Sequence, residues 1–217
     1  MTPDVKTPVA PSTRAERTEQ RIVAAARELF VAHGYRGTTL TDVARAAGVA
    51  ERTIYVRFAT KAELLKRVVD VAVVGDTQRI PLADRDWVEV VMNAPTLDER
   101  LAAEAAGAAE LMDRIAPVLA VAIQAEGEEP LIADAAQAAR EDTLRQGRAF
   151  WEKLAADGLL DPAVDLQWVI PTCALLANAE TYVHMTRTLR WTGEEYRQWR
   201  YRTWWHVATV PCATPPS

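Results

Sequence analysis

The side chains best placed to do chemistry lie in residues 38–61, which read TTLTDVARAAGVAERTIYVRFATK. The pattern predicts a helix of about two turns, a tight turn centred on Gly48 and a second short helix, which is the spacing of a helix-turn-helix. Apolar residues would pack the two helices together: Leu40, Val43, Ala44, Val49, Ile54 and Phe58. The second helix then leaves four residues facing outward: Arg52, Thr53, Tyr55 and Arg57. Guanidinium and hydroxyl groups in this arrangement can bind phosphates and base edges. Any short helical hairpin could show the same pattern, so the spacing alone leaves both interpretations open.

Lys61 adds a second feature of the same kind. It falls in the first turn of the next predicted helix, where the positive end of the helix dipole disfavours a cation. Free backbone N–H groups beside a lysine make a good anion site, and a DNA phosphate would resolve the conflict. The alternative is a lysine that extends into solvent at little cost.

No other set of residues is arranged for catalysis. The G-x-S-x-G, H-E-x-x-H, P-loop and G-x-G-x-x-G patterns are absent from the sequence. We therefore predict no catalytic residue, no metal site and no cofactor. Glu180 and His184 stand four residues apart on one predicted helix face, but without a third ligand they favour a pocket or interface pair over a metal site. Cys173 and Cys212 form no CxxC motif.

The elements that position these residues are predicted to be helices throughout. Ala, Leu, Glu and Arg dominate, and there are only nine Gly in the chain. Residues at capping-box spacing, such as Thr13 with Glu16 and Thr39 with Asp42, mark helix starts. We expect the first helix over 14–33 and the recognition helix over about 50–57. Later helices are expected over about 87–93, 97–109, 110–125, 131–157, 163–189 and 193–208. Pro171, inside the range 163–189, predicts a kink.

Charge is unevenly distributed along the chain. The net charge is −5, yet residues 1–75 carry twelve Lys/Arg against eight Asp/Glu, whereas residues 76–217 carry thirteen against twenty-two. A basic N-terminal third on an acidic body is typical of a DNA-contacting head, although chance clustering would give the same split. No apolar stretch is long enough to span a membrane and the Pro-rich start lacks a secretory signal, so we expect a soluble cytoplasmic protein with no membrane partner.

Residues 20–66 resemble the N-terminal domain of tetracycline-repressor-type (TetR) regulators. The matching features are LF…HGY at the end of the first helix, TT at the start of the second, A-x-x-A-G-V in the turn, T-I-Y-x-x-F in the recognition helix and K-x-E-L-L after it. The resemblance implies an all-α fold of about nine helices, with a three-helix helix-turn-helix domain and a C-terminal helical ligand-binding and dimerisation domain. The expected domains are a disordered arm (1–13), a DNA-binding domain (14–60), an effector-binding and dimerisation domain (61–209) and a disordered tail (210–217).

The function implied by the resemblance is that of a homodimeric, sequence-specific transcriptional regulator and not an enzyme. We expect a repressor that a small hydrophobic effector releases from a palindromic double-stranded DNA operator. The alternative is a helical small-molecule-binding or enzymatic bundle without DNA control. Carried over by position, the resemblance assigns phosphate contacts to Thr39, Thr41, Tyr55 and Lys61. It assigns base-facing positions to Ala50, Glu51, Arg52 and Thr53.

The sequence departs from the family pattern at Val56 and Arg57, where an aromatic residue and a His or Tyr are more usual. We expect that Val56 does not make the usual contact with the DNA backbone and that Arg57 supplies one in its place.

The C-terminal half offers two further predictions. Residues 187–206 contain five Arg, four Trp and two Tyr. Their aromatics spread over more of the helix than one core can cover, which predicts a dimer interface; a second nucleic-acid surface is the alternative. The predicted interface residues are Tyr196, Trp199 and Trp204.

An apolar effector pocket is predicted around Trp151, Trp168, Asn178 and Tyr182, with ordinary packing as the alternative.

Overall fold

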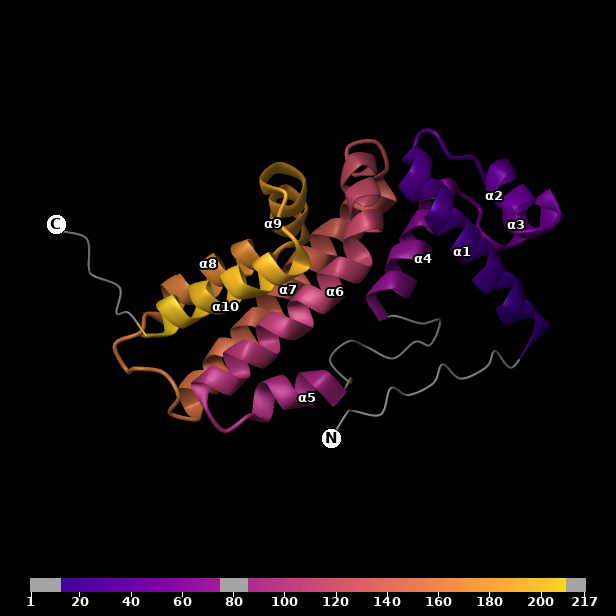
Figure 1. Ribbon diagram of the computed structural model, residues 1–217. Helices are drawn as coiled ribbons and strands as arrows, with labels where there is room; N and C mark the ends of the chain where they lie inside the picture. Colours follow the sequence, from indigo (N-terminus) through magenta and orange to yellow (C-terminus); the bar gives the residue numbers. More distant parts are fainter. Residues whose placement is uncertain (1–12, 75–85, 210–217) are drawn as a thin grey trace.

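The computed structural model describes residues 13–74 and 86–209, and every regular element in these ranges is a helix. The predicted arm before residue 13, residues 75–85, the predicted tail from residue 210 and Cys212 lie outside the described residues. Helices α1 to α4 form one end of the molecule, and α8 and α10 lie at the other (Figure 1). The all-α prediction is confirmed, with ten α-helices in the described part of the chain where about nine were expected.

The N-terminal head consists of α1 (Arg14–His33), α2 (Leu40–Ala46) and α3 (Glu51–Arg57). The predicted capping box is present at the start of α1, where the Thr13 hydroxyl accepts from the Glu16 N–H and the Glu16 carboxylate accepts from the Thr13 N–H. Gly48 supplies the positive φ of 62° that the α2–α3 turn requires. These local signals explain why the head matches its predicted boundaries closely.

Helix α4 (Lys61–Val74) joins the head to the body. Its buried face, which includes Leu64, Leu65 and Val68, belongs to the same apolar cluster as Phe30 of α1. That cluster continues into the body through Val118 of α6 (Leu97–Ala125). The core therefore runs without a gap across the domain boundary that the sequence places at residues 60 and 61.

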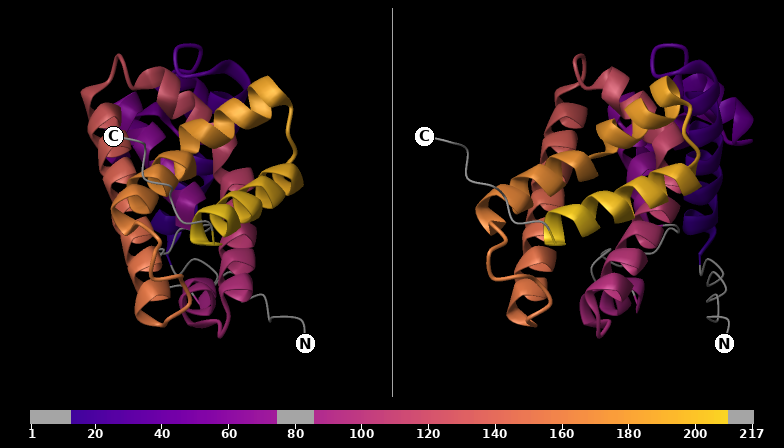
Figure 2. Two further views of the ribbon diagram at one scale, coloured as in Figure 1. Left: turned by 90° about the vertical axis from the view of Figure 1, so that its left-hand side faces the viewer. Right: turned by 60° about the vertical axis from the view of Figure 1, so that its left-hand side comes forward.

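The body contains α5 (Asp86–Asn93), α6, α7 (Pro130–Ala156), α8 (Leu166–Ala177), α9 (Ala179–His184), a π-helical turn (Met185–Leu189) and α10 (Gly193–Thr209). Helix α6 is central, since α4, α5, α7, α9 and α10 all pack on it, while α8 packs on α7. Figure 2 shows α8 and α10 on the face of the body that is turned away from the head. Among the described helices none combines the length and the apolar character needed to cross a membrane.

Two predicted helix boundaries in the body are wrong. The ranges 97–109 and 110–125 form the single helix α6, because Gly107 alone does not end a helix whose Ala105 and Ala109 are buried against the body. The range 163–189 is not one helix, because Asn178 takes an extended conformation (φ −63°, ψ 151°) between α8 and α9. A kink was expected at Pro171. Helix α8 continues through this proline, and the interruption at Asn178 falls seven residues after it.

Candidate nucleic-acid interface

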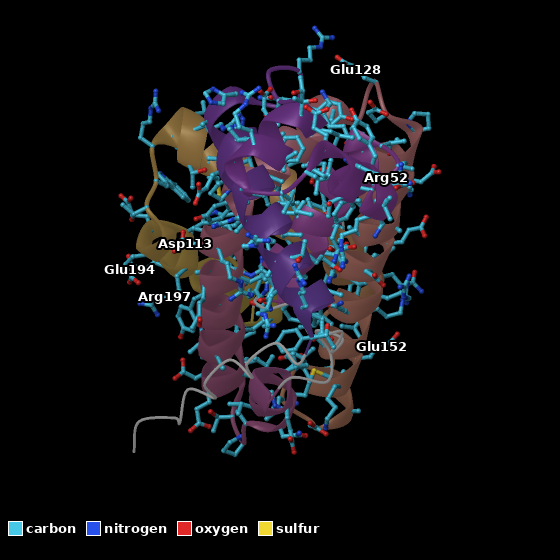
Figure 3. All side chains as sticks on the ribbon, turned by 90° about the vertical axis from the view of Figure 1, so that its right-hand side faces the viewer. Arg52, Asp113, Glu128, Glu152, Glu194 and Arg197 are labelled. Atoms are coloured by element: carbon cyan, nitrogen blue, oxygen red, sulfur yellow. The ribbon has the colours of Figure 1, made fainter. Side chains whose placement is uncertain are left out.

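Helix α3 packs against the rest of the head through its apolar residues and exposes its polar residues to solvent. Ile54 and Phe58 are buried, whereas Tyr55 is 52% exposed and Val56 76% exposed. Ala50, Glu51 and Arg52 are also exposed, and Thr53 is half-buried. In Figure 3, which views the molecule from the side of the head, Arg52 lies at the surface of this domain. The residues expected to face bases therefore form one accessible patch at the start of α3.

The N-terminus of α2 carries the next pair of predicted contacts. The Thr39 hydroxyl accepts from the Asp42 N–H at 3.1 Å and donates to the Asp42 carboxylate at 2.6 Å. This hydrogen bond and the nearby Arg45 guanidinium hold the pKa of Asp42 below its usual range. Thr39 is exposed and Thr41 is half-buried. Both hydroxyls lie at the end of α2 where backbone N–H groups favour an anion.

Arg57 is not free to face outward as the sequence predicts. Its guanidinium lies 3.2 Å from the carboxylate of Glu19 on α1, and the other oxygen of Glu19 accepts from Arg67 of α4 at 2.8 Å. All three side chains are about three-quarters buried, with exposures of 21–27%. The ion pair holds Arg57 toward the inside of the head, because Glu19 is a largely buried charge that Arg57 and Arg67 neutralise together.

Lys61 makes two contacts with Tyr35 of the α1–α2 turn. Its ammonium donates to the Tyr35 carbonyl at 2.7 Å and lies 4.1 Å from the centre of the Tyr35 ring. The Tyr35 hydroxyl donates to Glu129 at 2.7 Å, and burial together with this carboxylate raises the pKa of Tyr35. The ammonium thus has a protein partner in this structure, in place of the open anion site that the sequence indicates.

The head and body are joined by polar contacts around the α6–α7 turn. The Arg36 guanidinium binds the carboxylate of Glu128, and its hydrogen bonds lower the pKa of that group. Together with Tyr35 and Glu129, this pair connects the α1–α2 turn to the body; Figure 3 shows Glu128 at the tip of the turn. The α6–α7 turn is therefore bonded to Tyr35, the residue that accepts from Lys61.

Arg114 of α6 makes a second connection between head and body. Its guanidinium donates to the carbonyls of Ala72 and Val73 at 2.9 and 3.1 Å, which end α4. Its own backbone carbonyl accepts from Arg27 of α1 at 3.0 Å. Cations at a helix C-terminus satisfy carbonyls that have no partner within the helix.

A group of arginines on α1 was not among the residues predicted from the sequence. Arg14, Arg17 and Arg21 line a surface hollow of about 540 Å³ together with Thr18, Gln20 and Ala24. All three arginines are exposed. Their spacing of three and four residues puts them on one helix face, and this signal is present in the sequence.

The four residues predicted to line an effector pocket do not gather in one place. Trp151 is buried between Phe150 and Trp204 in one apolar cluster. Tyr182 belongs to another cluster, where its hydroxyl donates to Asp113. Trp168 is 45% exposed on α8, and Asn178 forms the break before α9.

The three residues predicted to form the dimer interface also differ in burial. Tyr196 and Trp204 are buried inside the protomer, where their exposures are 0% and 2%, so they are not available to a partner in this conformation. They pack around Arg200, which binds Glu104 of α6 and lies 4.8 Å from the Trp204 ring. Trp199 is half-buried. The large apolar residues that are exposed on these helices are instead Trp168 and Leu175 of α8 and Trp205 of α10.

The pair Glu180 and His184 has structural partners. Glu180 accepts from Arg140 of α7 at 2.8 Å, and Arg140 also binds Glu126 at the end of α6 through two hydrogen bonds of 2.8 Å. The His184 ring lies 3.4 Å from the Thr188 hydroxyl. Among the residues with described positions, no group of three His, Cys, Asp or Glu side chains could hold a metal ion.

Known proteins resemble the head in sequence and the whole chain in fold. The family described as bacterial regulatory proteins, tetR family, matches residues 22–68, which extend from α1 into α4. The HTH-type transcriptional regulator SrpR of Pseudomonas putida is 45% identical over 58 residues, which make up 27% of this chain and 27% of SrpR. The alignment thus spans about a quarter of that relative.

Two solved structures cover almost the whole chain. A structure described as the SmeT–triclosan complex aligns over 92% of this chain and 98% of the other, with a TM-score of 0.67 and 16% identity. MexZ, described as a key repressor responsible for antibiotic resistance in Pseudomonas aeruginosa, aligns over 90% and 97%, with a TM-score of 0.64 and 20% identity. At these identities the two structures show a shared fold. The head is thus similar in sequence to the tetR family of bacterial regulatory proteins, and the whole chain shares the fold of these two structures.

Proposed function

We propose that the protein is a sequence-specific DNA-binding transcriptional regulator and has no catalytic role. The observation that carries this proposal is the exposed polar start of α3 within the stretch that matches the family, held in place by the buried Ile54 and Phe58. In this proposal Ala50, Glu51, Arg52 and Thr53 face base edges in the major groove. A second set contacts phosphates: Thr39, Thr41, Tyr55 and Lys61.

In this proposal the role of Arg57 differs from the DNA-backbone contact that the sequence predicts. Because its guanidinium is paired with Glu19, it stabilises the position of α3 against α1. It is therefore not available to supply the phosphate contact that Val56 cannot make. The basic surface for phosphates must then include other cations of the head.

We further propose that the protein is a repressor whose operator affinity is lowered by a small hydrophobic effector. Support comes from the fold shared with a protein described as a repressor and with one described in complex with triclosan. The body holds an apolar cluster of α5 to α8 and α10 that includes Trp151, next to the cluster of Tyr182. An effector would enter by opening this packing, since an apolar cavity is the usual site for such a ligand.

The regulator is proposed to act as a homodimer on a palindromic operator. Three large apolar residues are exposed on α8 and α10: Trp168, Leu175 and Trp205. Large apolar side chains exposed on neighbouring helices indicate an interaction surface. Two heads related by a twofold axis would meet successive major grooves about 34–36 Å apart.

The test begins with selection of duplexes from a random DNA library by the full-length protein. The selected duplex and an unrelated duplex are then compared in mobility-shift titrations with the parent and with Arg52→Ala/Tyr55→Ala. We expect the parent to prefer the selected duplex and the double variant to lose this preference. If the library gives no enriched sequence and the parent binds no duplex at moderate salt, the protein is a helical bundle without DNA control.

A further inference from the structure

The three arginines on α1 form a continuous basic surface, here called the α1 arginine face. Arg14, Arg17 and Arg21 recur at three and four residues, so they stand one above the other along the helix. They line the same hollow of about 540 Å³, and each of them is exposed. The face occupies the first half of a 20-residue helix.

The nearby acidic residues of α1 have partners other than these three arginines. Glu19 is used by Arg57 and Arg67, and Glu16 accepts from the Thr13 N–H at the start of the helix. Within residues 13–74 and 86–209, no ion pair joins Arg14, Arg17 or Arg21 to another residue. Three guanidinium groups therefore lie on one exposed face of α1 without an ion-pair partner among the described residues.

The position of these charges is unfavourable for the protein without a ligand. Arg14 and Arg17 lie at the N-terminal end of α1, where the helix dipole is positive and disfavours a cation. Like charges three and four residues apart on a helix also repel each other. A polyanion lying on the face would reverse both effects, because each guanidinium would gain a partner.

The α1 arginine face adjoins the helix-turn-helix. A Cβ atom placed on Gly48 would lie 3.9 Å from the Arg21 guanidinium, so this side chain reaches the turn between α2 and α3. The stretch from Arg14 to Arg21 extends about 10 Å along the helix axis. That length corresponds to about three phosphate-to-phosphate steps of one DNA strand, which measure about 3.4 Å each along the duplex axis.

We propose that Arg14, Arg17 and Arg21 bind the phosphates of the DNA strand beside the major groove that α3 enters. The proposal rests on the DNA-binding function proposed above and adds a second contact surface to it. The face supplies affinity that does not depend on sequence, because guanidinium–phosphate contacts do not distinguish bases. It also provides the cations that the interface lacks when Arg57 is paired with Glu19.

The test compares two double variants that change the net charge equally. Arg17→Gln/Arg21→Gln alters the α1 arginine face, and Arg145→Gln/Arg148→Gln alters two exposed arginines of α7. Binding to the selected duplex and to an unrelated duplex is measured over a series of salt concentrations. Each phosphate contact that is removed lowers the slope of log affinity against log salt by about 0.9, so four contacts in a dimer lower it by about 3–4.

We expect Arg17→Gln/Arg21→Gln to weaken binding to both duplexes by the same factor and to flatten the slope, while the α7 variant resembles the parent. Circular dichroism confirms that each variant is folded, and Arg17→Lys/Arg21→Lys should keep most of the slope because it keeps the charge. The proposal is overturned if the Gln variant retains the slope of a parent that binds DNA, or loses affinity for the selected duplex alone. A parent that binds neither duplex overturns the proposed function itself.

Discussion

The ammonium of Lys61 donates to the carbonyl oxygen of Tyr35 at 2.7 Å and lies above the ring of the same residue. A lysine in the first turn of α4 thus satisfies a carbonyl of the neighbouring turn. A DNA phosphate at this position would compete with the carbonyl for the same ammonium. Tyr35 is also bonded to Glu129, so this one residue connects Lys61 to the α6–α7 turn.

The first prediction concerns this lysine. Lys61→Ala should weaken binding to selected and unrelated DNA alike and lower the salt slope by about 1 per subunit, since the proposed contact is with a phosphate. The free energy of unfolding should fall by about 1 kcal/mol with the loss of the bond to Tyr35. Lys66→Ala is the matched control, because Lys66 lies on the same helix and pairs with Asp70 at the surface. Equal DNA binding by the two variants would contradict the role of Lys61.

The second prediction separates Arg52 from Arg57. Arg52→Ala should reduce affinity by about 1–3 kcal/mol at one position of the selected sequence and leave binding to unrelated DNA nearly unchanged. Arg57→Ala should instead lower the free energy of unfolding, because it leaves Glu19 with Arg67 alone. The readouts are titrations against single-base variants of the duplex and urea denaturation. A sequence-selective loss with Arg57→Ala would show that its pairing with Glu19 opens on DNA.

The third prediction concerns neighbouring tryptophans of α10. Trp205→Glu should give folded monomers in sedimentation, since Trp205 is 39% exposed on the proposed dimer face. Trp204→Ala should cost about 3–5 kcal/mol of stability, because it empties a site in the core beside Trp151. Leu144→Glu on α7 serves as a control with a similar exposure of 38%. If Trp205→Glu leaves the mass of the parent unchanged, another face forms the dimer.

The fourth prediction is a pH dependence at the end of α6. Hydrogen bonds from Arg140 hold the pKa of Glu126 below its usual range. The folded protein therefore keeps this carboxylate ionised at a lower pH than the unfolded chain does. The pair stabilises the fold at neutral pH, and its contribution declines as the pH falls below the ordinary Glu value of about 4.3 toward the folded value.

Glu126→Gln should accordingly be less stable than the parent at neutral pH, and the two should converge in acid. Chemical denaturation at a series of pH values measures the difference in the free energy of unfolding. Glu110→Gln, at an exposed position of the same helix, should show little difference at any pH. A gap between Glu126→Gln and the parent that stays constant into acid would contradict the assignment.

The head could be predicted from the sequence because its signals are local. Thr13 with Glu16 and Gly48 each fix the backbone within a few residues. The surroundings of Arg57 could not be predicted, since Glu19 lies 38 residues away in the chain and only the packing of α3 against α1 brings it near. The contact between Lys61 and Tyr35 could not be predicted for the same reason.

The body was less predictable because its helices carry apolar residues on more than one side. Trp204 and Tyr196 fit inside the protomer because α10 packs on α6, and Arg200 between them is neutralised by Glu104. Helical periodicity alone does not distinguish this inner face from the outer one that carries Trp205. Asn178 ends α8 through a backbone conformation that no strong breaker residue announces.

The position of Arg114 has a consequence for protein engineering. One residue of α6 closes the last turn of α4 with its side chain and accepts from Arg27 of α1 with its backbone. A chimera that joins this head to the body of another regulator would lack the side-chain bonds to α4 unless the new body carries an arginine at the equivalent place. Exchanging heads between proteins of this fold therefore requires matching this junction residue in addition to the shared apolar core and the contacts of Tyr35 and Arg36.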